Sequence, residues 1–190
     1  LLYPLSKGAS SPAAAGGGKL MTARRGRIGI IANPMAGRDV RRLAARASEV
    51  THQAKREMVA RIAAGADAAG VECLVVHAEP WRIGTGALEG MELGARVEVV
   101  EPGTLKHGGE DTAAAALAMK DLGVTVLVVL GGDGTHRAVA QVWPEAPMVA
   151  VSTGTNNVFP SLVEPTLAGW AAGLVASGKV PLAAHSRRSK

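Results

Sequence analysis

The chain has 190 residues, of which 47% are hydrophobic and only 3% are aromatic, so a globular domain with an aliphatic core is expected. Its formal net charge of +5 comes from the two ends, because residues 28–186 hold 13 basic and 16 acidic residues, a net charge of −3. This distribution excludes a basic nucleic-acid-binding face, and the apolar runs fall well short of the roughly 20 residues that a membrane-spanning helix needs.

Residues 1–26 are interpreted as a disordered or non-native leader, because most of this stretch is rich in Gly, Ala, Ser and Pro and has no hydrophobic period. The single cysteine, Cys73, excludes an internal disulfide and fits a reducing compartment. It lies in a strand-like run, so we expect a buried structural thiol. The sequence therefore predicts a cytoplasmic protein.

From residue 27 onward, strand-like and helix-like segments alternate. In chain order we expect a strand at 27–33, helices at 37–50 and 53–70 with a break near Thr51, a strand at 71–78, a weak helix at 86–94, a strand at 96–101, a helix at 110–123, a strand at 124–131, a helix at 136–143, a strand at 147–152 and a helix at 164–178. Gly123 and Gly178 are expected to close two of these helices. The alternation predicts right-handed βαβ units and an α/β fold, a Rossmann-like parallel sheet with helices on both faces.

Three polar or glycine-rich loops follow predicted strands: NPMAG at 33–37, GGDGT at 131–135 and STGTNN at 152–157. In parallel α/β sheets, ligands bind at the carboxyl ends of the strands. These three loops are therefore the candidate binding loops.

The loop GGDGT combines three glycines, an acid and the start of a predicted helix. Gly131, Gly132 and Gly134 would let the backbone approach a ligand and adopt positive φ, and the helix that follows would direct N–H groups toward an anion such as phosphate. Asp133 is unexpected at an anion site. It fits if it holds Mg²⁺ or takes a proton from a hydroxyl that attacks phosphate; the alternative is that it only caps the helix.

The other two loops repeat parts of this pattern. In NPMAG, Asn33 ends a strand and Gly37 permits close approach, while three arginines of the predicted helix that follows could contact phosphate or form a solvated face: Arg38, Arg41 and Arg42. STGTNN offers neutral hydrogen-bonding groups that suit ribose and adenine, or it is simply a polar loop.

Signals for other chemistries are missing. The sequence contains no GxxxxGK[ST], no GxGxxG after the first strand and no GxSxG. Its five histidines show no metal-ligand spacing, so no residue is assigned as a metal ligand. His136 could act as a base beside Asp133, but a partly exposed histidine in the first helical turn is the favoured interpretation.

The motifs together are similar to those of one family. GGDGT after a buried strand resembles the nucleotide-binding motif of the NAD kinase and diacylglycerol kinase superfamily. The run EDTAAAALAMKDLGVTVLVVLGGDGTHRAVA, followed by STGTNNVFP and EPTLAGWAAGL, resembles the ATP-NAD kinase-like branch related to acetoin-catabolism protein X. The likeness extends from about Arg27 to the end of the chain and would make residues 27–180 an N-terminal nucleotide-binding domain.

This resemblance implies phosphoryl transfer from ATP, with Mg²⁺, to the 2′-hydroxyl of NAD or a related nucleotide. Asp133 would be the catalytic base. The residues implied in nucleotide binding are Asn33, Gly37, Gly131, Gly132, Gly134, Thr135, Gly154, Thr155, Asn156 and Asn157. Related kinases carry a second, β-rich domain that completes the site and the oligomer contacts. Residues 181–190 are interpreted as the start of that domain, which is otherwise absent, so this fragment could be inactive and the full-length protein is expected to be a homo-oligomer.

Two alternatives remain open. TGTNN and NPMAG also resemble the GTxND and NPxxG patterns of lipid kinases, so the acceptor could be a lipid of the diacylglycerol type or another small hydroxyl compound. The protein could also bind nucleotides as a regulatory module without turnover.

Overall fold

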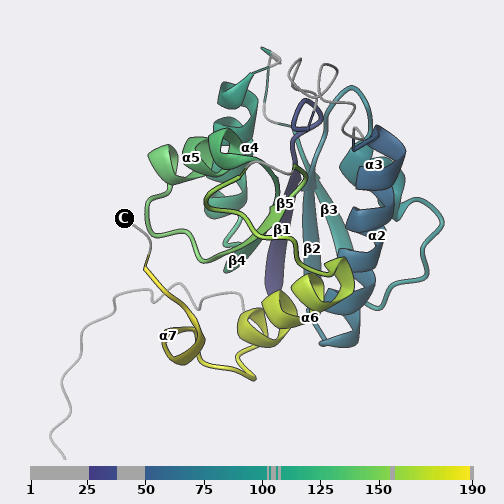
Figure 1. The fold of residues 1–190 in the computed structure, drawn as a ribbon. Helices are drawn as coiled ribbons and strands as arrows, with labels where there is room; N and C mark the ends of the chain where they lie inside the picture. Colours follow the sequence, from purple (N-terminus) through teal and green to yellow (C-terminus); the bar gives the residue numbers. More distant parts are fainter. Residues whose placement is uncertain are drawn as a thin grey trace, which may run out of the picture.

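The computed structural model describes residues 26–37, 50–101, 103, 106, 108–154 and 157–188. Within these residues, strands and helices alternate and form a three-layer structure (Figure 1). The strands are β1 Arg27–Ala32, β2 Cys73–His77, β3 Arg96–Val100, β4 Val126–Gly131 and β5 Met148–Ser152. The helices are α2 His52–Ala68, α3 Ile83–Leu88, α4 Gly109–Asp121, α5 Asp133–Val142, α6 Pro165–Ala176 and α7 Leu182–His185.

The five described strands form one parallel sheet in the order β3-β2-β1-β4-β5. All six residues of β1 and of β4 are buried, as expected for strands covered on both faces. The predicted Rossmann-like α/β fold is confirmed. Because β1 is followed by β2 on one side and β4 joins it on the other, the carboxyl ends of β1 and β4 lie at the switch point where such sheets bind ligands.

Helices cover both faces of the sheet (Figure 1). Apolar side chains of α2, α3 and α6 pack on one face, against alternate residues of the strands such as Ile28 and Val128. Those of α4 and α5 pack on the other, against residues such as Ile31 and Val129. The core is aliphatic, and Cys73 is buried in it as predicted, where burial raises the pKa of its thiol.

The helix boundaries differ from the prediction in three places. The weak helix expected at 86–94 forms earlier, at Ile83–Leu88, because the Glu79 carboxylate accepts hydrogen bonds from the backbone N–H groups of Trp81 and Ile83. Gly90, with φ +74°, follows that helix. Helix α5 begins at Asp133, three residues before the expected start, and the short helix α7 was not expected.

Other boundaries agree with the sequence. Thr51 caps α2, and its hydroxyl accepts from the Ala54 N–H at 3.1 Å. Gly123 and Gly178 follow α4 and α6 with φ +76° and +73°. The helix expected at 37–50 and the leader up to residue 25 lie outside the described residues, and the start of a β domain at 181–190 stays a prediction. No described helix is long and apolar enough to cross a membrane.

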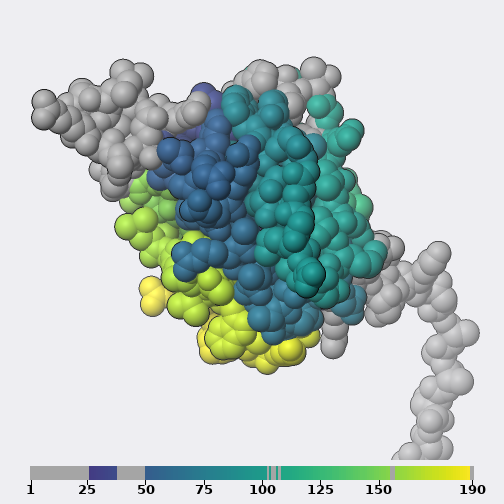
Figure 2. Space-filling view, turned by 90° about the vertical axis from the view of Figure 1, so that its right-hand side faces the viewer, coloured from purple at the N-terminus to yellow at the C-terminus, as the bar shows by residue number. Residues whose placement is uncertain are grey.

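Helices α2 and α6 pack at unusually close range, side by side on one face of the molecule (Figure 2). A Cβ atom added to Gly169 would overlap the Ile62 carbonyl, and one added to Gly65 would overlap the Thr166 carbonyl. Glycine at these positions therefore sets the distance between the two helix backbones.

Replacing Gly169 by Ala should lower the free energy of unfolding by about 3 kcal/mol, because the added methyl group would overlap the backbone of α2. Gly86→Ala in α3 is the matched control. Its added Cβ would lie 3.5 Å from the nearest Arg56 atom, so it should be neutral or stabilise by about 0.5 kcal/mol. Urea unfolding of the two variants measures this; equal stabilities would contradict the packing argument.

Candidate functional site

The three predicted loops lie together at one edge of the sheet, because they follow the adjacent strands β1, β4 and β5. Hydrogen bonds join them. Asn33 Nδ2 donates to Thr135 Oγ1 at 2.9 Å, and the Asn33 N–H donates to the Leu130 carbonyl at 3.0 Å. The Thr153 N–H donates to the Gly131 carbonyl at 3.3 Å. The structure therefore brings Asn33, Gly131 to Thr135 and the loop after β5 into one site.

Asp133 is the first residue of α5 and is half-buried. Its carboxylate does not accept from the N–H groups of its own helix. Oδ1 accepts from the Phe159 N–H at 2.9 Å, and the Val158 N–H lies 3.1 Å from Oδ1 and 3.0 Å from Oδ2. The alternative that Asp133 only caps α5 is therefore wrong, since the N-cap is Gly132 and the carboxylate instead anchors the segment after β5.

Those two backbone donors set the acidity of the site. Hydrogen bonds from the Phe159 and Val158 N–H groups hold the pKa of the Asp133 carboxyl below its usual range. The group is ionised at neutral pH, as a cation ligand must be. The same shift makes it a weaker proton acceptor while these hydrogen bonds are in place.

The three glycines of the turn were expected to adopt positive φ, but none of them does. Gly131 is required because a Cβ there would overlap the Thr135 side chain, and a Cβ on Gly132 would lie 2.9 Å from Asn157 Oδ1. Gly131 is therefore fixed by packing inside the protein, whereas at Gly132 only the end of the Asn157 side chain would have to move. At Gly134, an added Cβ would meet nothing within 4 Å. Only Gly134 leaves open space of the kind a ligand could approach.

The loop after β5 is tied by its own polar groups. Ser152 Oγ donates to the Gly154 carbonyl at 2.6 Å and accepts from Asn157 Nδ2 at 2.7 Å. Asn157 therefore lies beside both Gly132 and Ser152. Thr155 and Asn156 lie outside the described residues, so their predicted roles stay predictions.

The loop after β1 depends on a residue that the sequence analysis missed. Lys55 of α2 is fully buried, and its Nζ donates to the carbonyls of Asn33, Pro34 and Ala36 at 3.0, 2.7 and 2.7 Å. Gly37 ends this loop with φ +81°, which favours glycine. The three arginines proposed as phosphate contacts lie outside the described residues.

A signal for Lys55 was present in the sequence. It lies four residues before Val59 and seven before Ile62, on the stripe of α2 that packs into the core. A lysine at a core-facing position must find acceptors, because an unsatisfied buried ammonium is costly. Only the fold reveals that those acceptors are carbonyls of the loop after β1.

His136 is buried rather than partly exposed, so that interpretation was wrong. Its Nδ1 lies 2.9 Å from the Gly132 carbonyl and its Nε2 lies 3.2 Å from the Val129 carbonyl, while its ring packs edge-on against Phe159. Burial lowers the pKa of His136, although the two carbonyls oppose this shift. The ring therefore packs on the core side of the turn and is shielded from solvent.

Comparisons with known proteins agree with this architecture. The family model for the ATP-NAD kinase N-terminal domain matches residues 28–180. Acetoin catabolism protein X of Cupriavidus necator is 39% identical over an alignment of 164 residues that covers 81% of this chain and 45% of that protein. An uncharacterized protein of Archaeoglobus fulgidus is 39% identical over 70 residues, 37% of this chain and 22% of that protein. The chain spans less than half the length of these relatives, and no solved structure matches.

Replacing Lys55 by Met should lower the free energy of unfolding by about 3 kcal/mol, because the carbonyls of the loop after β1 lose their shared donor. Lys120→Met, on the exposed surface of α4, is the matched control and should change stability by less than about 0.5 kcal/mol. Chemical denaturation measures both. Similar effects of the two substitutions would contradict the role given to Lys55.

The lowered pKa of His136 should appear in the pH dependence of stability. Between its lowered folded pKa and an unfolded value of about 6.5, the unfolded chain binds more protons, so stability falls as the solution is acidified. The slope from this group is at most about 1.4 kcal/mol per pH unit. Unfolding curves recorded below and above about pH 6.5 should show a shallower slope for His136→Leu than for the unaltered chain, and equal slopes would contradict the prediction.

Proposed function

Because the chain belongs to the ATP-NAD kinase family, we propose that it binds ATP and transfers the terminal phosphoryl group to the 2′-hydroxyl of NAD or a related nucleotide. The observation that carries the proposal is the position of Asp133. An ionisable carboxylate lies at the N-terminus of a ten-residue helix, at the switch point of the sheet, in a turn joined to both neighbouring loops. A kinase needs an acid and an anion site together at such a point.

The phosphates are assigned to the turn around Gly134. The open space at that residue and the first N–H groups of α5 suit an anion. Asn33 and Asn157 flank the turn. Asn33 Nδ2 donates to Thr135 and its Oδ1 accepts from the Met35 N–H, while Asn157 Nδ2 donates to Ser152. Binding there would be set by backbone N–H groups, which orient phosphate oxygens without needing a lysine.

Asp133 fits two roles in this chemistry, proton acceptor for the attacking hydroxyl or ligand of Mg²⁺. Mg²⁺ is commonly held by one or two carboxylates together with phosphate oxygens, so this single carboxylate beside a phosphate site fits the ion. The described residues contain no cluster of three His, Cys, Asp or Glu that would hold a metal by themselves. Bound Mg²⁺ would neutralise charge on the phosphates, while the chain orients them.

The proposal includes the setting of the reaction. We place the protein in the cytoplasm, where its single thiol stays reduced and both nucleotides are available. Its partners would be nucleotide substrates, and full-length copies would form a homo-oligomer.

Asp133→Asn tests the role of the carboxylate. The amide oxygen can still accept from the Val158 and Phe159 N–H groups, so the fold should survive, whereas NADP formation from ATP, Mg²⁺ and NAD should fall by about 10³-fold. Asp121→Asn, at the exposed end of α4, makes the same charge change and should leave the rate unaltered. NADP is measured by chromatography; undiminished turnover in Asp133→Asn would remove this residue from the mechanism.

A second candidate is nucleotide binding without turnover. It is favoured by the two N–H groups that occupy the Asp133 carboxylate and weaken it as a base. The Cupriavidus relative, moreover, is named for acetoin catabolism and not for a kinase activity. Calorimetric binding of ATP or NAD, with no product from NAD, diacylglycerol or a sphingoid base, would support this candidate over the first.

A further inference from the structure

Strand β3 forms an outer edge of the sheet, and within the part of the chain that the structure describes no strand pairs with its outer side. The strand order ends at β3, next to β2. On the side of β2, the Arg96 N–H donates a hydrogen bond at 3.0 Å and the Val100 carbonyl accepts one at 2.8 Å. Because successive residues of a strand direct their N–H and C=O groups to opposite sides, those of Val97 and Val99 point outward.

The same two residues expose apolar side chains at this edge. Val97 is 43% exposed and Val99 is 50% exposed, although they pair in register with Leu74 and Val76, which are fully buried in the core. Proteins commonly protect a free edge strand with proline or lysine. Strand β3, with the sequence RVEVV, contains neither. The edge is therefore open to pairing with another strand.

The charged residues of β3 make the strand complementary to a second copy of itself. Arg96 and Glu98 lie on the other face of the strand, one on each side of Val97, and their side chains are 69% and 30% exposed. In an antiparallel pair of two β3 strands centred on Val97, Arg96 of each copy would lie opposite Glu98 of the other. Opposite charges at facing positions stabilise a strand pair.

The charges also select the register of such a pair. If it were centred on Glu98, the Glu98 carboxylates of the two copies would face each other, and like charges at facing positions destabilise a strand pair. Both registers would pair the outward backbone groups of Val97, so the charges decide between them. The Ala95 N–H is already held by the Asp67 carboxylate at 2.7 Å, so Ala95 offers a second copy only its carbonyl.

We propose that β3 is a self-association edge, at which two copies of this chain pair their β3 strands antiparallel about a two-fold axis at Val97 and join their sheets into one. The homo-oligomer implied by the family resemblance was attributed to a second domain, whereas this interface belongs to the described domain itself. Because the paired edge is short, the dimer is expected to be weak and to form at micromolar or higher concentration.

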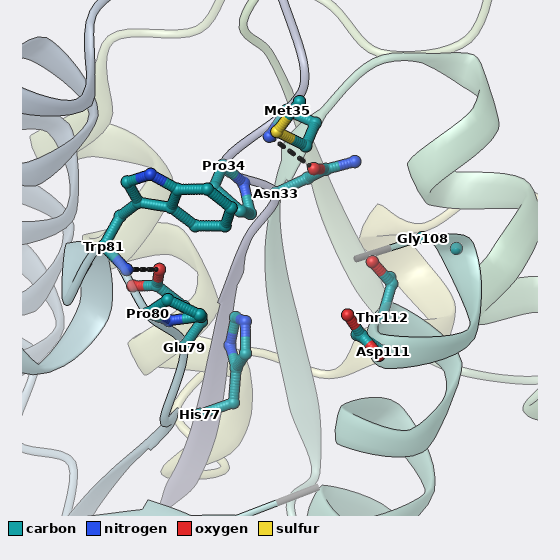
Figure 3. Close-up of a pocket in the computed structure, with 11 residues that line it drawn as sticks. Asn33, Pro34, Met35, His77, Glu79, Pro80, Trp81, Gly108, Asp111 and Thr112 are labelled. Atoms are coloured by element: carbon teal, nitrogen blue, oxygen red, sulfur yellow. Dashed lines mark hydrogen bonds between the residues drawn. The ribbon is translucent and has the colours of Figure 1, made fainter. Parts of the chain in front are cut away.

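The interface lies apart from the site proposed for phosphoryl transfer. Val97 pairs with Leu74 near the amino end of β2. His77, the last residue of β2, lines a pocket at the carboxyl end of the sheet together with Asn33, which joins the proposed site (Figure 3). The inference therefore does not depend on the proposed function, and a monomeric variant should keep whatever activity the chain has.

Sedimentation velocity of the full chain at increasing concentration tests the association. The unaltered chain should shift from monomer to dimer. Val97→Pro should remain a monomer, because proline has no N–H to donate; it should still fold, since the N–H of Val97 faces away from β2. An unaltered chain that stays monomeric up to the highest soluble concentration would overturn the proposal, as would a dimer that Val97→Pro leaves intact.

A charge reversal provides a second test that does not rely on proline. Arg96→Glu would place like charges opposite each other in the pair, so it should weaken association by about tenfold or more. Arg61→Glu, on the exposed surface of α2, also removes an ion pair and is the matched control; it should leave association unchanged. Equal effects of the two variants would contradict the role given to Arg96, and if Val97→Pro does not fold, the test rests on this pair.

Cysteines at the edge test the register. In the proposed pair, the Cα atoms of the two Val97 residues lie about 5.5 Å apart, which a disulfide can span, whereas the two Val99 residues are offset by about 14 Å along the strands. Mild oxidation should link Val97→Cys into a covalent dimer and leave Val99→Cys monomeric on a non-reducing gel. Cys73 is buried, so the unaltered chain should not be linked. Equal linking of the two variants, or linking of Val99→Cys alone, would overturn the register.

The outcomes also separate this inference from the proposed function. NADP formation by a chain that stays monomeric would refute the β3 interface and leave the kinase standing. A dimer that Val97→Pro and Arg96→Glu disrupt, in a chain without turnover, would support the interface and count against phosphoryl transfer.

Discussion

The site depends on the parallel pairing of β1 with β4, in which Ala32 lies beside Leu130. This register ends the two strands at the same height, so that Asn33 follows one strand just where the glycine turn follows the other. Contacts between the loops follow from this pairing and from that of β4 with β5: Asn33 Nδ2 donates to Thr135, the Thr153 N–H donates to the Gly131 carbonyl, and Asp133 accepts from the segment after β5. A slip of one residue would turn the side chains of β1 to the opposite faces of the sheet and separate the loops.

Two buried side chains, the cationic Lys55 and the polar His136, contact this edge of the sheet from the core. Lys55 gathers three carbonyls of the loop after β1, and His136 lies between the carbonyls of Val129 and Gly132. Some carbonyls of this edge also accept from nearby backbone N–H groups, since the Ala36 N–H donates to Asn33 and the Thr135 N–H donates to Gly132. The buried side chains of α2 and α5 add further polar contacts, so that the folding of the core also fixes the binding edge.

The sequence predicted the fold well. Hydrophobic runs, glycines that follow helices, and apolar residues at helical spacing are local signals, and they agree with one another along most of the chain. It also placed the three loops, since parallel strands bring their carboxyl ends together. The roles within the loops were harder to predict. Glycine is required at position 131 because the Thr135 side chain packs against it, and the Asp133 carboxylate is held by N–H groups 25 and 26 residues further along the chain. These contacts exist only once the chain has folded.

The segment that holds Asp133 presents two apolar side chains to solvent: Val158 is 96% exposed and Leu162 is 83% exposed. The backbone N–H of Val158 donates to the Asp133 carboxylate, while the side chain of the same residue is exposed to solvent. A change in the backbone conformation at Val158 would therefore change the hydrogen bonds that hold the pKa of the Asp133 carboxyl below its usual range.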